Sequence, residues 1–317
     1  MTELFIPPKE MFFRLRGYVS NYFLYSRHEQ EPTFGHTPGP VYPDQWWQLI
    51  PGTGKFAGYY QIQSKFTGKV IFSRNSPVKL IGHVVGDGNY EDNWFKIEPG
   101  TGKLAGYFRL RNYQTDRVLF SRLQPEPELN DYPGHLKSGD DNYFTFILED
   151  LEMEITRVEY HLDKAMVTDS VSEVIGSMTL RNRGAVSQVA EFEFTRDETN
   201  SSSFEYTHGY PIRVGTSGKV AIPFVESGQV KVDGTKSQTL KWGTAITETK
   251  PYSIRLPAVG PFDNKITVTA FVSRSNIEVP FTVYSRSVAK GFEVATHGIY
   301  KGVTHWNVRT DVKQERA

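Results

Sequence analysis

The sequence predicts an all-β protein of two domains. Short runs such as YYQIQS and KVIFSR alternate apolar and polar residues, and Gly, Pro and Asn turns separate them. The string PGTGK occurs at residues 51–55 and again at 99–103, which indicates an internal repeat. Beyond residue 150 longer alternating runs such as KITVTAFV replace the repeat. We therefore expect one domain over residues 1–150 and an elongated β-sheet module over 151–317.

Three columns of similar residues recur at intervals of about 48 residues in the first domain. They are Phe12–Leu15, Tyr59–Ile62 and Tyr107–Leu110; Ser26-Arg27, Ser73-Arg74 and Ser121-Arg122; and Asp44–Trp47, Asp92–Phe95 and Asp141–Phe144. A unit of hairpins cannot bury its own apolar face, but three units that close around an axis can, and closure removes sheet edges. Three repeats that end in Gln-x-Trp or a variant resemble the ricin B-type β-trefoil lectins. The literal motif stands only at Gln45–Trp47, and the other two lobes have Asn-x-Phe.

The PGTGK strings are predicted to be turns between lobes. A phosphate-binding loop reads G-x-x-x-x-G-K-[ST], and five residues before Gly54 and Gly102 stand Leu49 and Ile97. The residue after each Lys is also neither Ser nor Thr. These two departures argue against a nucleotide site.

Composition excludes several classes of function. Lys and Arg number 36 and Asp and Glu also number 36, which argues against a general nucleic-acid binder. The chain has no cysteine, so we expect no disulfide framework and no thiolate chemistry. The first residues lack the pattern of a secretory signal, so we expect synthesis as a soluble cytosolic protein. No His-Glu-x-x-His or Gly-x-Ser-x-Gly motif is present. We therefore expect no enzyme, no cofactor and no metal site.

A sugar site needs an aromatic side chain for the apolar face of a pyranose and polar groups for its hydroxyls. Lobe two offers GDGNYEDNW and lobe three offers PGHLKSGDDNY, whereas GPVYPDQWW in lobe one is expected to bind poorly. The candidate residues are Arg74, His83, Asp87, Tyr90, Asp92 and Asn93 in lobe two, and Arg122, His135, Asp140, Asp141 and Asn142 in lobe three.

Each candidate also has a structural interpretation. The Arg of the second column and the Asp of the third occur in all three lobes, so they can pair and hold each lobe together. Tyr90 can be a rim aromatic that packs on a neighbour, and the acidic residues can form a solvated loop. Calcium is a poorer fit, because DGNYEDN lacks the ligand spacing of an EF-hand.

Residues 212–234 alternate in the way a membrane-inserting hairpin would. The apolar positions are Ile212, Val214, Val220, Ile222, Phe224, Val230 and Val232. Residues 212–222 have the length of a tilted transmembrane strand, roughly 9–11 residues, and Pro211 and Pro223 are expected to mark its start and turn. A lone hairpin cannot insert because its unpaired backbone groups cost several kcal/mol each, so insertion requires a closed ring of chains. The alternative is an amphipathic hairpin on a soluble sheet.

Four strings across both domains resemble the haemolytic lectins of bracket fungi. They are GDGNYEDNWFKIEPG (86–100), NYFTFILED (142–150), VPFTVYSRS (279–287) and GFEVATHGIYKGV (291–303). Members of that family join a ricin B-type β-trefoil to an aerolysin-type pore-forming module. The likeness covers nearly the whole chain, although Pro223-Phe224-Val225 and two lysines, Lys219 and Lys231, are particular to this sequence.

The resemblance implies a function as well as a fold. It implies binding of β-galactosides such as lactose or N-acetyllactosamine in two of the three lobes. It further implies assembly into a homo-oligomeric ring, with one hairpin per subunit, at about residues 212–233, refolding into a transmembrane barrel in the target cell membrane. An agglutinating lectin without lytic activity, whose second domain only oligomerises, is the alternative.

Overall fold

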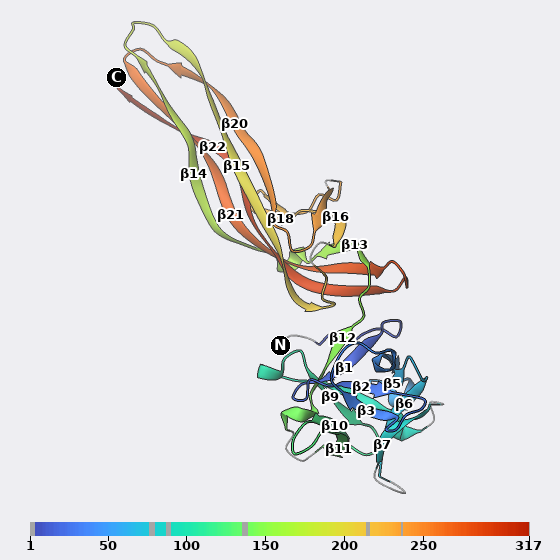
Figure 1. Ribbon diagram of the computed structural model, residues 1–317. Helices are drawn as coiled ribbons and strands as arrows, with labels where there is room; N and C mark the ends of the chain where they lie inside the picture. Colours follow the sequence, from blue (N-terminus) through green and yellow to red (C-terminus); the bar gives the residue numbers. More distant parts are fainter. Residues whose placement is uncertain are drawn as a thin grey trace. The chain divides into compact units, whose positions relative to one another are not determined.

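The computed structural model describes residues 4–75, 80–86, 90–134, 139–213, 216–235 and 237–316. The chain divides into two compact units, Met1–Glu152 and Met153–Ala317. Every regular element in the described part of the chain is a β-strand or a short 3-10 turn, which confirms the all-β class (Figure 1). Among the described residues, no helix has the length and apolar character needed to span a membrane.

Within its described residues the first unit has twelve strands, four in each lobe. They are β1 (Phe13–Gly17), β2 (Phe23–Ser26), β3 (Phe34–Thr37), β4 (Trp47–Pro51), β5 (Tyr60–Ser64), β6 (Lys69–Arg74), β7 (Leu80–Val85), β8 (Phe95–Pro99), β9 (Phe108–Asn112), β10 (Arg117–Arg122), β11 (Glu128–Pro133) and β12 (Phe144–Leu148). The first and fourth strands of each lobe close a ring, β1-β4-β5-β8-β9-β12. The second and third strands form one hairpin per lobe. This is the predicted β-trefoil.

The repeat columns supply the interior of this ring. Phe13 and Phe108 from the first column, and Trp47, Phe95 and Phe144 from the third, are all fully buried. β1 and β9 alternate strictly between buried and half-buried residues, as strands with one covered face do. Burial of each large aromatic stabilises the fold by about 2–3 kcal/mol, so the three-fold repeat is a repeat of core residues.

The two PGTGK strings form the turns that the sequence predicts. Gly54 and Gly102 begin the 3-10 turns η2 (Gly54–Phe56) and η4 (Gly102–Leu104), which join β4 to β5 and β8 to β9. Both glycines have positive φ, 58° and 59°, a conformation that residues with a Cβ rarely adopt. The turns therefore lead from one lobe to the next, as predicted.

The second unit is built on long antiparallel strands. They are β13 (Met153–Tyr160), β14 (Met166–Asn182), β15 (Gln188–Gly209), β20 (Ile246–Gly260), β21 (Asn264–Ser287) and β22 (Glu293–Arg316), and a 3-10 turn, η6 (Leu162–Lys164), links β13 to β14. The order in the sheet is β13-β21-β22-β15-β20, with β14 also paired to β21. The β21–β22 hairpin is paired along almost its whole length. This elongated sheet is the predicted aerolysin-like module.

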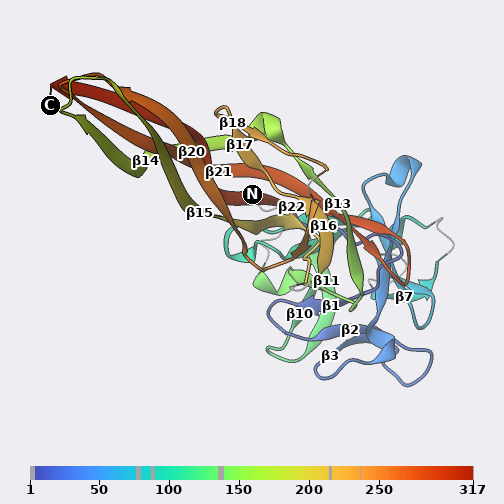
Figure 2. The ribbon, with the colours of Figure 1, turned by 90° about the horizontal axis from the view of Figure 1, so that it is seen from above.

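Four short strands lie between β15 and β20. They are β16 (Ser217–Ala221), β17 (Phe224–Glu226), β18 (Gln229–Lys231) and β19 (Ser237–Lys241). β16 pairs with β19, and β17 pairs with β18, so together they form one interrupted hairpin. β16 lies against β13, and β17 lies against β21 and β22 (Figures 1 and 2). We call residues 217–241 the insertion hairpin.

Candidate functional site

The same ion pair is built into each lobe of the trefoil. Arg27 Nε lies 2.6 Å from Asp44 Oδ2 in lobe one, and Arg74 Nε lies 3.0 Å from Asp92 Oδ2 in lobe two. The third pair joins Arg122 Nε to Asp141 Oδ2 at 3.1 Å. The pairing that the sequence left open is thus present in every lobe.

Each of these arginines also stacks on an aromatic ring two residues before it. The guanidinium carbons of Arg27, Arg74 and Arg122 lie 3.8–3.9 Å from the ring centroids of Tyr25, Phe72 and Phe120. A ring beneath and a carboxylate beside the guanidinium hold it rigid, while part of its edge stays exposed. The sequence contains this aromatic-x-Arg spacing in all three lobes, but the sequence analysis did not use it to predict a binding site.

A hollow of about 580 Å³ opens over this pair in lobe two. Its lining includes Arg74, Tyr90, Asp92, Gln114 and Thr115, which brings together three of the predicted sugar residues. Tyr90 is 61% exposed, so its ring is available to a ligand. An exposed ring beside an oriented Arg–Asp pair and neutral hydroxyl and amide groups matches what a pyranose requires.

Lobe one has an equivalent hollow, which the sequence reading did not anticipate. It measures about 740 Å³ and its lining includes Arg27, Tyr42, Asp44 and Phe66. Tyr42 and Tyr90 both stand immediately before the 3-10 turns η1 (Pro43–Gln45) and η3 (Glu91–Asn93), so they occupy equivalent positions. The geometry therefore does not set lobe one apart as a poor binder.

Lobe three departs from this arrangement at the same position. Gly139 stands before η5 (Asp140–Asn142), where the other lobes carry tyrosine. Asp140 reaches away from the Arg122–Asp141 pair and bonds Lys103 Nζ at 2.6 Å. Two predicted site residues, Asp87 in lobe two and His135 in lobe three, lie outside the described residues. The described part of lobe three thus offers a charged pair without the flanking ring.

Asn93 and Asn142 were predicted to grip sugar hydroxyls, but both side chains are fully buried. Asn142 Nδ2 donates to the Tyr132 hydroxyl at 2.5 Å. Each of these amides directly follows the aspartate of the Arg–Asp pair in its 3-10 turn, and in lobe two that aspartate lines the hollow. Their position favours a role in shaping the loop over direct contact with a ligand.

His83 belongs to a different constellation from the one predicted. Its Nδ1 lies 2.6 Å from Ser26 Oγ, which places it against lobe one rather than over the lobe-two hollow. Ser121 Oγ lies 2.6 Å from His36 Nδ1, and Ser73 Oγ donates to Asp131 Oδ2 at 2.5 Å. The serine of each lobe thus contacts the third strand of the following lobe, a set we call the serine clasp.

The two histidines of the serine clasp should make the trefoil less stable in acid. Burial is the main cause that lowers the pKa of His36 and of His83 to about 4, from an ordinary value near 6.5. Folding therefore favours the neutral rings. The stability that this contributes is complete above about pH 6.5 and is lost as the pH falls towards 4.

Between pH 7 and pH 5 we expect the free energy of unfolding to fall by about 2 kcal/mol, after discounting for the partial exposure of both rings. Urea titrations of the full chain at the two pH values measure this change. A His36→Gln/His83→Gln variant should lose most of the pH dependence. A wild-type protein equally stable at both pH values would contradict the assignment.

The insertion hairpin differs in register from the predicted one. The tip lies at Ser227 and Gly228, which both have positive φ (52° and 77°) and form the two-residue turn of β17 and β18. Pro223 instead interrupts the strand between β16 and β17, because proline has no N–H for the ladder. The prediction that the chain turns at Pro223 is therefore wrong, and the paired segment runs to Lys241.

The predicted lipid-facing residues that the structure describes are buried or half-buried. Ile212 and Val220 are 8% and 3% exposed, although Ile212 precedes the first strand of the hairpin. Val214 lies outside the described residues. Four further predicted residues are half-buried, namely Ile222, Phe224, Val230 and Val232. Val225 is 4% exposed and was missed, because the inward face changes phase across the break at Pro223.

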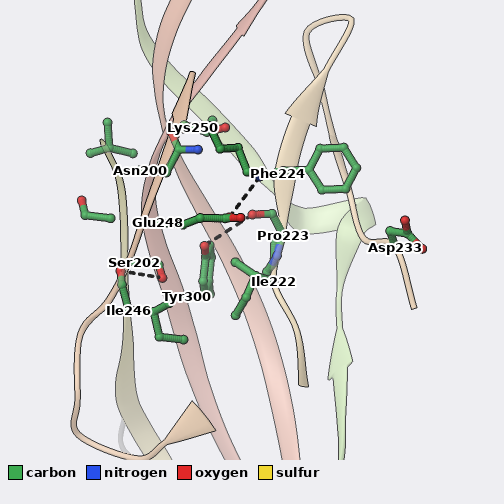
Figure 3. A pocket seen from close by; sticks show the side chains of 13 residues that line it. Asn200, Ser202, Ile222, Pro223, Phe224, Asp233, Ile246, Glu248, Lys250 and Tyr300 are labelled. Carbon is green, nitrogen blue, oxygen red and sulfur yellow. Dashed lines mark hydrogen bonds and ion pairs between the residues drawn. The ribbon is translucent and has the colours of Figure 1, made fainter. Parts of the chain in front are cut away.

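Two tyrosines hold the break in the hairpin against the sheet. The Tyr160 hydroxyl donates to the Ala221 carbonyl at 2.7 Å, and the Tyr300 hydroxyl donates to the Pro223 carbonyl at 3.4 Å. Ile222, Pro223 and Phe224 line a cavity of about 220 Å³ together with Tyr300 and residues of β15 and β20 (Figure 3). Gly218 approaches β13 so closely that an added Cβ would lie 2.5 Å from Ile155 Cβ. The hairpin is thus fastened to the sheet by side-chain contacts.

Comparison with known proteins relates the two units to different groups. Residues 151–307 match the family described as Clostridium epsilon toxin ETX/Bacillus mosquitocidal toxin MTX2. The crystal structure titled BEL beta-trefoil is 39% identical and covers 47% of this chain and all of its own, with a TM-score of 0.44. No curated protein matches the chain in sequence.

Two further solved structures are similar at lower identity. Lamprey immune protein is 17% identical and aligns over 96% of this chain and 98% of its own, with a TM-score of 0.44. An aerolysin-like protein of Bombina maxima is 16% identical and covers 50% of this chain and 96% of its own, with a TM-score of 0.37.

Proposed function

The chain carries a domain of the ETX/MTX2 toxin family over residues 151–307 and a β-trefoil similar to that of BEL, and we propose that it is a sugar-directed pore-forming toxin. In this proposal the trefoil binds β-galactoside glycans on the target cell. The second unit then assembles into a homo-oligomer in which each insertion hairpin enters the membrane. The family is one of toxins and is not enzymatic in kind.

The lobe-two hollow is the observation that carries sugar binding. Arg74 is oriented by Asp92 and stacked on Phe72, and Tyr90 leaves an exposed ring beside them. A galactoside presents one apolar face and several hydroxyls, which match the ring and the charged pair. A single site of this openness binds in about the millimolar range, and several hollows on an oligomer raise the effective affinity.

The insertion hairpin supports the membrane step. In its described residues the strands pair only with one another, while side-chain contacts from Tyr160 and Tyr300 hold the hairpin to the sheet. The arm from Ser217 to Glu226 has about the ten residues that a tilted strand needs to cross the hydrocarbon core. Because a lone hairpin leaves its outer backbone groups unsatisfied in lipid, neighbouring chains must complete the pairing.

Release of haemoglobin from erythrocytes tests both halves of the proposal. We expect the purified protein to lyse the cells and excess lactose to prevent lysis, while sucrose at the same concentration does not. Sucrose is the matched control because it has the same mass and osmotic effect but no β-galactoside.

The possible outcomes separate the two steps. Lysis that lactose fails to block would support pore formation and contradict binding of a β-galactoside. Agglutination that lactose blocks, without release of haemoglobin, would support the alternative of a non-lytic lectin whose second unit only oligomerises.

A further inference from the structure

Three side chains that the proposed function does not use converge inside the second unit. Glu173 comes from β14, Glu198 from β15 and His305 from β22. One carboxylate oxygen of each glutamate and one ring nitrogen of His305 all lie within 4.8 Å of one another. Glu198 and His305 are 8% and 7% exposed, so this is not an ordinary solvated acidic face.

The contacts of His305 assign a tautomer to its ring and direct the other ring nitrogen at Glu198. The His305 backbone N–H donates to Asn200 Oδ1 at 2.9 Å, which identifies that atom as an acceptor. His305 Nδ1 lies 3.0 Å from the same oxygen, so Nδ1 must carry a proton and donate it. In the neutral ring Nε2 then has a lone pair, and it faces Glu198 Oε2 at 3.5 Å. Two acceptors that are buried face to face need a positive charge between them, which either a proton on Nε2 or a bound metal ion can supply.

Two arginines lie beside the cluster, and each contacts one carboxylate oxygen of a cluster glutamate. Arg196 Nε lies 2.6 Å from Glu198 Oε1, and Arg274 Nε lies 3.8 Å from Glu173 Oε1. Each arginine therefore approaches one oxygen of its glutamate. In Glu198 the other oxygen is the one that faces the imidazole. The two guanidiniums also reduce the negative charge of the site, so the affinity for a cation should be micromolar rather than nanomolar.

We propose that Glu173, Glu198 and His305 bind a divalent transition-metal ion, for which Zn²⁺ is the best match. Zinc accepts one imidazole and two carboxylates at bond lengths of about 2.0–2.2 Å. Tetrahedral ligands at that distance lie about 3.4 Å apart, close to the observed 3.5 Å between Nε2 and Oε2. The Nδ1–H bond to an amide oxygen is the outer contact that orients metal-bound histidines. This departs from the sequence-based expectation of no metal site.

The three ligands come from strands that are not all hydrogen-bonded to one another. β14 pairs with β21, whereas β15 pairs with β22 and β20. A bound ion would therefore connect β14 to β15 and β22 where the backbone ladder does not. Zinc should stabilise the folded second unit, since an ion that binds only the folded state raises its stability by mass action.

Isothermal titration of the metal-free, untagged full chain with ZnCl2 tests the site. We expect one equivalent to bind in the micromolar range and the thermal midpoint to rise by roughly 5 °C at a hundredfold excess over Kd. Glu173→Gln removes one ligand at the least buried of the three positions and should weaken binding at least tenfold. Glu193→Gln is the matched control, because Glu193 lies on β15, the strand of Glu198, but bonds Arg255 at the surface.

Two results would overturn the proposal. One is the absence of zinc binding to a folded wild-type chain. The other is binding of equal affinity in wild type and Glu173→Gln that is lost in His208→Ala, because the stacked rings of His208 and His297 are a pair of imidazoles that could hold zinc instead. Since the titration needs no membrane or sugar, its outcome is independent of whether the chain is lytic.

Discussion

An Ile155→Cys/Gly218→Cys variant should lose its lytic activity on oxidation and recover it on reduction. The chain has no cysteine, so this pair would form the only disulfide in the protein. A Cβ at position 218 would lie 2.5 Å from Ile155 Cβ, and a disulfide needs about 3.5–4.5 Å between the two Cβ atoms. A shift of about 1 Å in β16 accommodates the bond.

The expected loss is complete because the bond ties β16 to β13. The insertion hairpin cannot leave the sheet while this link is closed, and an undocked hairpin is a requirement of the proposed membrane step. Haemoglobin release with and without dithiothreitol measures the effect. Retention on a galactoside column should be unchanged, since the substitutions lie in the second unit.

A second disulfide provides the matched control. Ser177 on β14 and Thr269 on β21 are cross-strand partners whose hydroxyl oxygens lie 3.1 Å apart. Cysteines at these two positions link strands of the long sheet and leave the insertion hairpin unconstrained. The proposal is supported if the oxidised control lyses cells and the oxidised Ile155→Cys/Gly218→Cys variant does not. Full lysis by the oxidised Ile155→Cys/Gly218→Cys variant would show that the hairpin stays docked during pore formation.

Tyr90→Ala should weaken lactose binding in lobe two by about tenfold while leaving the fold intact. The ring supplies the apolar platform of the hollow, and loss of such a platform costs on the order of 1–2 kcal/mol of binding free energy. Because Tyr90 is 61% exposed, its removal should change the free energy of unfolding by less than about 0.5 kcal/mol.

Indole resonances allow the lobes to be observed separately in the full chain. Trp94 adjoins the lobe-two turn, and Trp46 adjoins the equivalent turn of lobe one. In a lactose titration, Tyr90→Ala should abolish most of the shift of the Trp94 indole and spare that of Trp46. Tyr42→Ala, the matched variant in lobe one, should do the reverse. An unchanged Trp94 response in Tyr90→Ala would remove the lobe-two hollow from sugar binding.

The trefoil was predictable because its determinants repeat. Each column recurs at nearly equal spacing, so core residues such as Trp47 and Phe95 identify one another in the sequence. Positive φ at Gly54 and Gly102 likewise follows from the duplicated turn. Repetition does not separate the roles of neighbouring columns, because the fully buried Asn93 directly follows Asp92 of the Arg–Asp pair and was predicted to have the same role.

Features that depend on contacts distant in sequence were not predictable. His83 meets Ser26 across two lobes, and no local pattern marks that partnership. In the second unit the phase change at Pro223 was read as a turn, because a strand break and a tip have similar compositions. Glu173, Glu198 and His305 are separated by up to 132 positions, so only folding brings them together.

The serine clasp has a consequence for how the trefoil can be divided. Ser26 relies on the second lobe, Ser73 on the third and Ser121 on the first, so the contacts run in a cycle. Excision of any lobe would leave one buried serine hydroxyl and one clasp partner of another serine without these contacts in the remaining two lobes. Fragments of two lobes should therefore be poorly folded. The three lobes should unfold in one cooperative transition rather than one after another.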